Sequence, residues 1–222
     1  MPEQNDLTLY LSPAEYIDSD DAAVQSFARD AIEGVVGTKA RAIALYNAVR
    51  DAVAYDPYRD YTDPATFRAS SVLAAGRGFC VGKSALLSAC ARSIGIPARA
   101  GFADVRNHLT SKRLSALTQT DTFYWHSYTE LLIDGKWVKC TPAFDRALCE
   151  RAKIAPLEFD GVNDSLFHPF DSAGRRHMEY LRDRGAFDDV PFETIVADFR
   201  KHYPKLVESG KSGGNFRAEV ST

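Results

Sequence analysis

The residues best suited to chemistry in this sequence are a cysteine and the glycines before it. Cys80 ends the run Gly76-Arg77-Gly78-Phe79-Cys80, and a helical pattern of apolar residues begins at the cysteine itself. A helix N-terminus has unpaired N–H groups and a partial positive charge, so it favours an anion. Because the thiolate is the nucleophilic form of cysteine, this setting predicts a thiol with a lowered pKa.

A candidate base follows 46 residues after the cysteine, in the run Trp125-His126-Ser127-Tyr128. A histidine in a strand is more often structural, so a catalytic role requires His126 and Cys80 to meet in the fold. An imidazole beside a thiol can take its proton and later protonate the leaving group. The pair predicts cysteine-dependent acyl transfer through a thioester.

The strongest strand pattern in the chain surrounds this histidine. Phe123 to Ile133 and Lys136 to Thr141 flank Asp134-Gly135, a residue pair typical of a two-residue type I′ turn. The turn predicts an antiparallel hairpin in which Ile133 pairs with Lys136.

Continuing that register brings further polar residues to the face of the hairpin that carries His126. The residues predicted on this face are His126, Tyr128, Thr141, Ala143 and Asp145. Thr141 and Asp145 are then the diagonal neighbours of His126, about 7–8 Å away between backbones. Asp145 could orient the imidazole as the third member of a triad. Pro142 could instead end the strand before the register reaches Asp145.

The remaining patterns predict the elements that position these residues. Helices are expected from Ser19 to Gly37, from Thr38 to Val53, near Ser71 to Ala75, from Cys80 to Ile94, from Ala173 to Arg182 and from Pro191 to Tyr203. Strands are expected at Leu7 to Leu11 and at Ala98 to Val105. A polar segment from Asn107 to Asp121 reads as a loop with some helix.

Bulk properties exclude several classes of protein. The 222 residues carry a net charge of −3, which gives no basis for binding nucleic acid or an anionic membrane. No apolar run reaches the roughly 18 residues of a membrane helix, and the polar start is unlike a signal peptide, so we expect a cytoplasmic protein. The four cysteines lack CxxC spacing and predict reduced thiols, with no metal site and no cofactor.

Several motifs together resemble the transglutaminase-like superfamily, in its uncharacterised bacterial form. They are Gly78-Phe79-Cys80 opening a helix, Leu86-Leu87, Ile94-Gly95-Ile96-Pro97-Ala98-Arg99, His126-Ser127-Tyr128-Thr129-Glu130 and Gly135-Lys136-Trp137-Val138. These core motifs span residues 72–146. The resemblance implies a papain-like α+β fold: a helical lobe whose catalytic cysteine helix packs on a small antiparallel sheet that carries the histidine. We expect one domain over residues 1–204 and a flexible tail over 205–222.

The resemblance also implies roles for individual residues. The family cysteine falls on Cys80 and its histidine on His126, while the position of its aspartate holds Thr141. Either Asp145 substitutes for that aspartate, or the triad is reduced to a dyad. An upstream aromatic in the family helps to form the oxyanion hole, which makes Tyr55 and Tyr58 candidates.

These observations lead to one main hypothesis and two alternatives. The main hypothesis is an enzyme that hydrolyses or transamidates an amide in a peptide, protein or small molecule, with Cys80, His126 and Asp145 as catalytic residues. Phe79 and Val81 differ from the neighbours of the cysteine in animal cross-linking enzymes, which argues against that activity. The alternatives are a binding or scaffold module with a compromised triad, and cysteine-based acetyl transfer. The substrate and the oligomeric state stay open.

Overall fold

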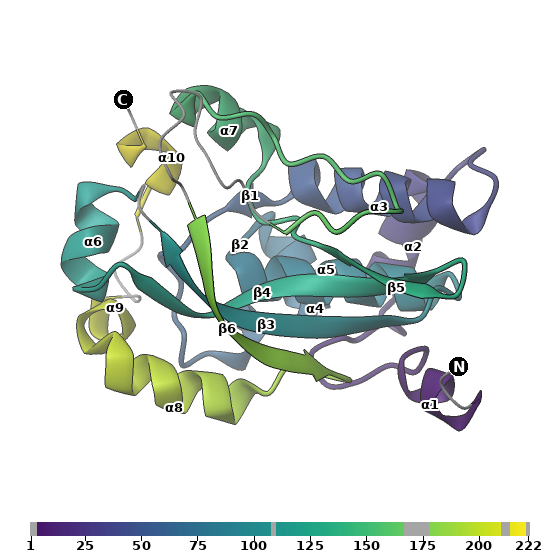
Figure 1. The fold of residues 1–222 in the computed structure, drawn as a ribbon, viewed down its shortest axis with the longest axis horizontal. Helices are drawn as coiled ribbons and strands as arrows, with labels where there is room; N and C mark the ends of the chain where they lie inside the picture. The colour runs from purple at the N-terminus through teal and green to yellow at the C-terminus, as the bar shows by residue number, and fades with distance from the viewer. Residues whose placement is uncertain (1–3, 108–109, 167–177, 210–213, 221–222) are drawn as a thin grey trace.

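A single helix packed against an antiparallel sheet forms the centre of the molecule. The computed structural model describes residues 4–107, 110–166, 178–209 and 214–220. Helix α5 (Cys80–Ser93) lies against one face of the sheet, with α2, α3 and α4 behind it, as Figure 1 shows. The arrangement is the mixed α+β class that the sequence predicted.

The sheet has four antiparallel strands in the order β5-β4-β3-β6. Their bounds are Ala98–Asn107 for β3, Thr122–Ile133 for β4, Lys136–Cys140 for β5 and Met178–Phe187 for β6. Ile133 pairs with Lys136, as predicted. The two turn residues, Asp134 and Gly135, have φ angles of 49° and 80°, which a type I′ turn requires.

The helices and the second sheet surround this centre. The helices are α1 (Gln4–Leu9), α2 (Ala22–Ala31), α3 (Thr38–Ala52), α4 (Ala69–Ala75), α6 (Lys112–Thr118), α7 (Arg146–Ala152), α8 (Phe192–His202), α9 (Pro204–Ser209) and α10 (Phe216–Glu219), with a 3₁₀ turn at Pro64–Thr66. Two short parallel strands, β1 (Ala54–Tyr55) and β2 (Arg77–Gly78), lead into α5. The predictions for α3, α5, α8 and the hairpin are therefore confirmed.

Helix α5 is buried along almost its whole length. Every residue from Cys80 to Arg92 is buried, so no face of the helix is left to solvent. The hydroxyl of Thr129 on β4 donates to the carbonyl of Ser84, 3.0 Å away, and fixes the helix against the sheet. Gly82 permits close packing on the other side, because a Cβ there would lie 2.7 Å from Val72 and 2.8 Å from the carbonyl of Thr66.

Two local predictions were wrong. Leu7 to Leu11 was expected as a strand, but residues 4–9 form α1, and Leu9 and Leu11 are exposed. In this segment the carbonyl of Tyr10 accepts the N–H of Ala98 at the start of β3, 3.0 Å away, but the described residues form no strand ladder here. Ala173 to Arg182 was expected as a helix; Met178–Phe187 is instead strand β6, paired with β3, and the part before residue 178 lies outside the described residues. Tertiary pairing overrides weak local preference here.

The chain beyond residue 204, expected as a flexible tail, contains packed structure. Helix α9 buries Leu206 and α10 buries Phe216. Residues 210–213 and 221–222 of the expected tail lie outside the described residues. The composition of this segment is polar and glycine-rich, so its few apolar anchors gave little local signal.

A buried lysine joins α5 to the end of α3. The Nζ of Lys83, fully buried, donates to the carbonyls of Arg50 (2.8 Å) and Val53 (2.5 Å), the last turn and C-cap of α3. Helix C-termini leave such carbonyls without intrahelical donors and favour a cation. Burial nevertheless lowers the pKa of Lys83 to about 7, with Asp145 and Asp51 opposing the fall. Lys83 thus holds the first turn of α5 in place.

We predict that Lys83→Met flattens the pH dependence of stability. The folded-state pKa, about 7, lies below the unfolded value of about 10.4, so the unfolded chain binds more protons between these pH values. The free energy of unfolding of the wild type should therefore rise with pH across this window, by up to about 1.4 kcal/mol per pH unit from this group. Urea unfolding from pH 6 to pH 10 measures the slope, and equal slopes in the two proteins would contradict the prediction.

Candidate active site

The backbone before Cys80 is shaped so that the cysteine begins α5. Gly76 ends α4 in the left-handed conformation, with φ 62°. The chain then runs through β2, where Gly78 pairs with Tyr55 of β1. Phe79 is the N-cap residue, and its side chain makes no capping hydrogen bond. The side chain of the N-cap residue therefore does not occupy the first N–H groups of α5.

The thiol of Cys80 is surrounded by backbone donors but is almost completely buried. Its residue is 8% exposed. Burial raises the pKa of Cys80 to about 11, while hydrogen bonds from the N–H groups of Ser127, Val81 and Cys80 itself oppose the rise. The sequence predicted a lowered pKa. Desolvation outweighs the helix N-terminus because an enclosed site withholds the water that would stabilise a thiolate.

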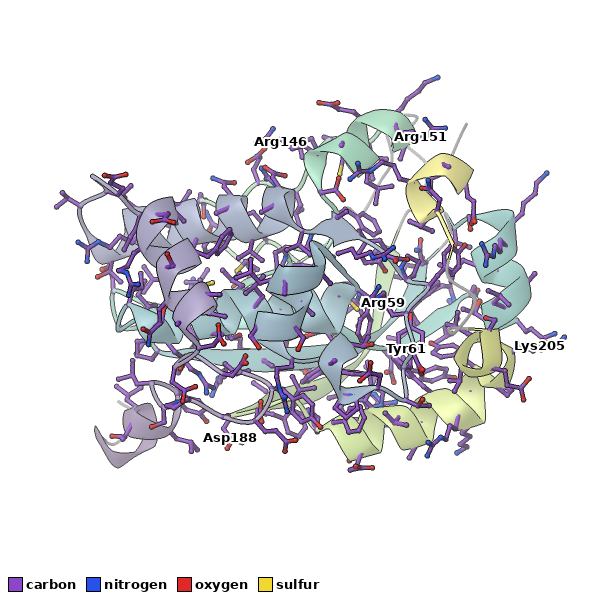
Figure 2. The ribbon with its side chains drawn as sticks, turned by 180° about the vertical axis from the view of Figure 1, so that it is seen from behind. Arg59, Tyr61, Arg146, Arg151, Asp188 and Lys205 are labelled. Atoms are coloured by element: carbon purple, nitrogen blue, oxygen red, sulfur yellow. The ribbon has the colours of Figure 1, made fainter. Side chains whose placement is uncertain are left out.

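Three tyrosines lie near this thiol. A thiolate at Cys80 would raise the pKa of Tyr55, Tyr61 and Tyr203, which burial already raises. Tyr61 lies in the interior of the molecule in Figure 2, and its hydroxyl donates to the carbonyl of Pro57. The hydroxyl of Tyr203 donates to the carbonyl of Thr122, 2.8 Å away. Sequence reasoning singled out Tyr55 alone of these three.

His126 is next to Cys80 through the backbone of β4. Strand β5 stops pairing with β4 at Cys140, opposite Thr129, and two residues further along β4 the N–H of Ser127 hydrogen-bonds to the thiol. The peptide that joins His126 to Ser127 therefore lies at the N-terminus of α5. The structure thus brings the backbone beside His126 to Cys80, and a working pair of imidazole and thiol stays a prediction.

A bulge immediately before His126 is held by buried charges. Trp125 has a φ of 58°, rare for a residue with a large side chain, and β3 and β4 shift register at Asp104. Asp104 accepts the N–H of Trp125 at 3.2 Å and forms an ion pair with Arg184 at 2.6 Å. The guanidinium of Arg184 lies 4.3 Å from the ring centroid of Trp125. Sequence analysis missed this network because its members come from β3, β4 and β6.

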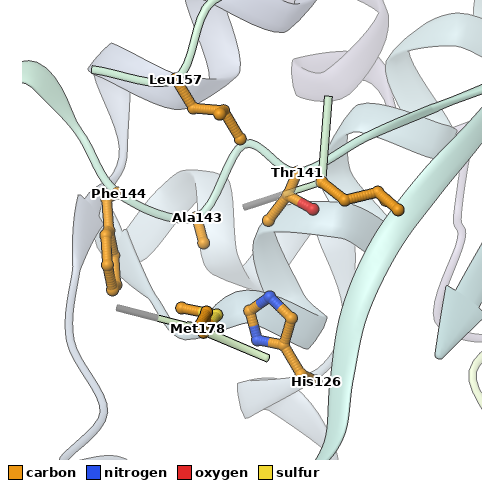
Figure 3. Close-up of a pocket in the computed structure, with 7 residues that line it drawn as sticks. His126, Thr141, Ala143, Phe144, Leu157 and Met178 are labelled. Atoms are coloured by element: carbon orange, nitrogen blue, oxygen red, sulfur yellow. The ribbon is translucent and has the colours of Figure 1, made fainter. Parts of the chain in front are cut away.

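The side chain of His126 lines a small pocket with Thr141 (Figure 3). The cavity has a volume of about 20 Å³, enough for one water molecule. The lining residues are His126, Thr141, Ala143, Phe144, Leu157, Leu166 and Met178. Thr141 is 6% exposed, and among the described residues its hydroxyl has no hydrogen-bond partner. Thr141 and Ala143 thus share a pocket with His126, as the extended register suggested.

Asp145 takes a different position from the one that the register suggested. Strand β5 ends at Cys140, before Pro142, and Asp145 is the N-cap of α7. Its Oδ1 accepts the N–H of Leu148 at 2.9 Å and an Arg217 N–H at 2.7 Å, and its Oδ2 accepts the N–H of Tyr55 at 2.9 Å. Asp145 therefore supports the backbone at Tyr55, and its side chain is not among those that line the His126 pocket.

Tyr58, the other aromatic candidate, contacts the C-terminal part of the chain. Its hydroxyl donates to Oε2 of Glu219 and shares a 3.1 Å hydrogen bond with Ser111. Tyr55 packs its ring edge-on against Phe144, with the centroids 4.8 Å apart. Of the two, the structure brings Tyr55 to Cys80.

Across the described ranges, no group of three or more His, Cys, Asp or Glu side chains is arranged to hold a metal ion. Within those same ranges, no helix combines the length and apolar character needed to cross a bilayer.

Comparison with known proteins identifies the family. The model of the transglutaminase-like superfamily matches residues 25–142, more than half of the chain. The chain belongs to the transglutaminase-like superfamily. The match includes Cys80, His126 and Thr141, which makes the resemblance seen in the sequence a finding. A comparison with curated proteins finds no match.

A solved structure shares the fold. It is described as a "putative cysteine protease" from Cytophaga hutchinsonii, and it is 18% identical to this chain with a TM-score of 0.51. The alignment covers 85% of this chain and 49% of that one, so this chain spans about half of that protein. The predicted papain-like, transglutaminase-like α+β fold is confirmed.

We predict that Cys80 in the folded protein reacts slowly with iodoacetamide at pH 7 and faster as the pH rises toward its pKa of about 11. In the urea-unfolded chain the same thiol should react with an apparent pKa of about 8.5. Peptide mass spectrometry of the alkylated protein between pH 6 and pH 11 gives both profiles. A rate that reaches its plateau below pH 8 in the folded protein would instead show a resting thiolate–imidazolium pair.

Proposed function

We propose that this protein is a cysteine-dependent hydrolase of amide bonds, with Cys80 as nucleophile and His126 as general base. The observation that carries the proposal is the position of the Ser127 N–H, which directly follows His126 in β4 and favours a thiolate at Cys80, the first residue of α5. Membership of the transglutaminase-like superfamily supports it. Transamidation remains the variant of this chemistry in which an amine replaces water.

The chemistry follows from the protonated resting thiol. His126 accepts the proton of the Cys80 thiol as the sulfur attacks the carbonyl carbon of an amide. The tetrahedral intermediate collapses when its C–N bond breaks and the imidazolium gives the proton to the departing nitrogen. Water then attacks the thioester, again with His126 as base, and releases the carboxylic acid and the free thiol.

Backbone groups at the start of α5 provide the oxyanion site in this proposal. The N–H groups of Cys80 and Val81 lie beside the sulfur, where they favour a thiolate, and in this proposal they face an oxyanion formed next to it. Tyr55 is the second donor that we propose. Burial keeps the pKa of its phenol well above the ordinary value, so its hydroxyl retains the proton that a donor needs.

Thr141 takes the place of the acid that would orient the imidazole. In this proposal a water molecule in the 20 Å³ pocket links the Thr141 hydroxyl to the His126 ring. A carboxylate would stabilise the imidazolium more than a neutral hydroxyl does. Cys80 and His126 therefore work as a catalytic dyad of reduced strength. Asp145 contributes indirectly, through the backbone of Tyr55.

We predict that Cys80→Ala and His126→Ala each abolish hydrolysis. The test uses a panel of peptidyl aminomethylcoumarin amides that vary the residue before the scissile bond, with Cys90→Ala as the matched control, because Cys90 is a buried thiol of the same helix. Wild type and control should release coumarin, and hydroxylamine should cleave an acyl group from Cys80 alone. Equal rates in wild type and Cys80→Ala would overturn the proposal and favour a binding module.

We predict that Thr141→Asp strengthens the dyad. A carboxylate at this buried position favours the imidazolium, so the pKa of His126 should rise and kcat/KM should increase by about tenfold or more. Thr141→Asn is the control, since it has nearly the same shape as Asp without the charge. NMR titration of the imidazole and the coumarin assay measure the two effects. Identical results for Asp and Asn would show that charge at residue 141 is not what limits the dyad.

A further inference from the structure

The C-terminal strap, defined here as residues 214–220, packs on Tyr55 and Tyr58, the two aromatic candidates that precede Cys80 in the sequence. In Figure 1 it is the segment around α10, between α6 and α7, far in sequence from both. Phe216 is buried, with its ring centroid 5.5 Å from that of Tyr55 and 6.0 Å from that of Tyr58. Phe216 thus packs on Tyr55, which is near enough to Cys80 for a thiolate there to raise the pKa of the Tyr55 phenol.

Charged side chains determine the N-to-C direction in which the strap runs across this surface. Arg217 forms a 2.7 Å ion pair with Asp145, which is 3% exposed. Two residues later, Glu219 pairs with Arg113 at 3.1 Å, accepts a hydrogen bond from Ser111 at 3.2 Å and accepts another from Tyr58. The receiving surface thus presents a carboxylate at one end and a cation at the other, and a reversed strap would place like charges together.

The backbone of the strap is also in close contact. A Cβ at Gly214 would lie 2.4 Å from the Tyr58 ring and 2.6 Å from the Arg113 guanidinium, so this residue approaches as only glycine can. The carbonyl of Ala218 accepts a hydrogen bond from Arg151 of α7, which Figure 2 labels beside α10. The surface therefore contacts main chain and side chains together, as a peptide-binding groove does.

We propose that this surface is the peptide-binding groove of the enzyme and that the strap is its internal competitor. The ligand class follows from what the groove holds: a peptide with an aromatic residue, a basic residue directly after it and an acidic residue three positions after it. This identification of the groove as a substrate site rests on the proposed function; the binding itself does not. Release of the strap uncovers Tyr55 and opens Cys80 to solvent and substrate.

The energetics allow the strap to be displaced. Its anchors are one buried ring, hydrogen bonds from Tyr58, Ser111 and Arg151, and two ion pairs. The Arg partners of the pairs are 43% and 41% exposed, so solvent screens them and limits what each pair contributes. A strap joined to α9 through a short segment has an effective concentration in the millimolar range. A free peptide of the same pattern, or a protein that presents it, can therefore compete at about that concentration.

The binding test uses a chain that ends at Ser209 and a fluorescein-labelled peptide of residues 214–220. We expect the truncated protein to bind this peptide, as fluorescence anisotropy reports. A control peptide in which Arg217 and Glu219 are exchanged has the same composition and should bind much more weakly, because both charges then face like charges. Equal binding of the two peptides, or no binding of the first, would overturn the proposal.

The accessibility test measures alkylation of Cys80, which requires no catalytic turnover. Truncation should increase the alkylation rate at pH 8 on the order of tenfold, since the strap is otherwise held at millimolar effective concentration, and added peptide should reverse the increase. An unchanged rate would overturn the proposal. Circular dichroism and thermal unfolding check that the truncated chain is folded.

A full-length variant keeps the proposal testable if truncation unfolds the protein. Glu219→Arg should loosen the strap and speed alkylation, and the added substitution Arg113→Glu should restore the slow rate by reversing the ion pair. Lys201→Ala, at an exposed position of α8, is the control that should leave the rate unchanged. The proposal would be contradicted if Glu219→Arg did not increase the alkylation rate of Cys80, or if the double variant did not restore the slow rate.

The two proposals can fail separately. If the truncated protein binds the peptide and its Cys80 is alkylated faster, but it releases no coumarin, the proposed groove stands and the proposed hydrolase activity is rejected. If full-length and truncated protein release coumarin equally and the peptide does not bind, the proposed hydrolase activity stands and the proposed role of the strap is rejected.

Discussion

The packing of α5 against β4 is the contact on which the rest of this structure depends. Together with α2, α3 and α4 it buries α5 from Cys80 to Arg92, and it brings the thiol near the N–H of Ser127, directly after His126. The hydroxyl of Thr129 and the small size of Gly82 permit the close approach on two sides of the helix. Lys83 fixes the same turn to the end of α3. A shift of this helix would separate the two candidate catalytic residues at once.

The same burial decides the protonation state of the resting site. A helix N-terminus stabilises an anion by about 0.3–1 kcal/mol, and by up to about 2 in partly buried settings. The pKa of Cys80 is raised to about 11, so desolvation outweighs all the donors around the sulfur. The resting cysteine is therefore a thiol. In our proposal, substrate or solvent must enter before His126 can take its proton, and the strap stands at that entrance.

The surroundings of Thr141 and Asp145 separate the two candidates for supporting His126. Thr141 shares the pocket of His126 but offers a neutral hydroxyl. Asp145, four residues later, is committed to the N-terminus of α7, to the backbone of Tyr55 and to Arg217. One carboxylate thus links the candidate oxyanion residue to the C-terminal strap. Through Asp145, the family core at residues 25–142 meets a segment that lies outside the matched region.

The sequence by itself determined the elements whose patterns are local. The glycines before Cys80, the apolar run of α5 and the Asp134-Gly135 turn specify a helix start and a hairpin register without help from distant residues, so the motifs also identified the family. Cys80 and His126 could be singled out in the same way, because their neighbours carry the signal.

Tertiary structure alone decided what depends on residues far apart in the chain. The raised pKa of Cys80 comes from enclosure by several elements, the bulge at Trp125 from Asp104 and Arg184, and the place of Asp145 from α7 and the strap. Residues 178–187 became a strand because β3 offered them an edge. Residues 214–220 are polar and look flexible in sequence, but Phe216, Arg217 and Glu219 find their partners in other elements. A local pattern contains no information about such partners, because burial and charge pairing arise only when the chain has folded.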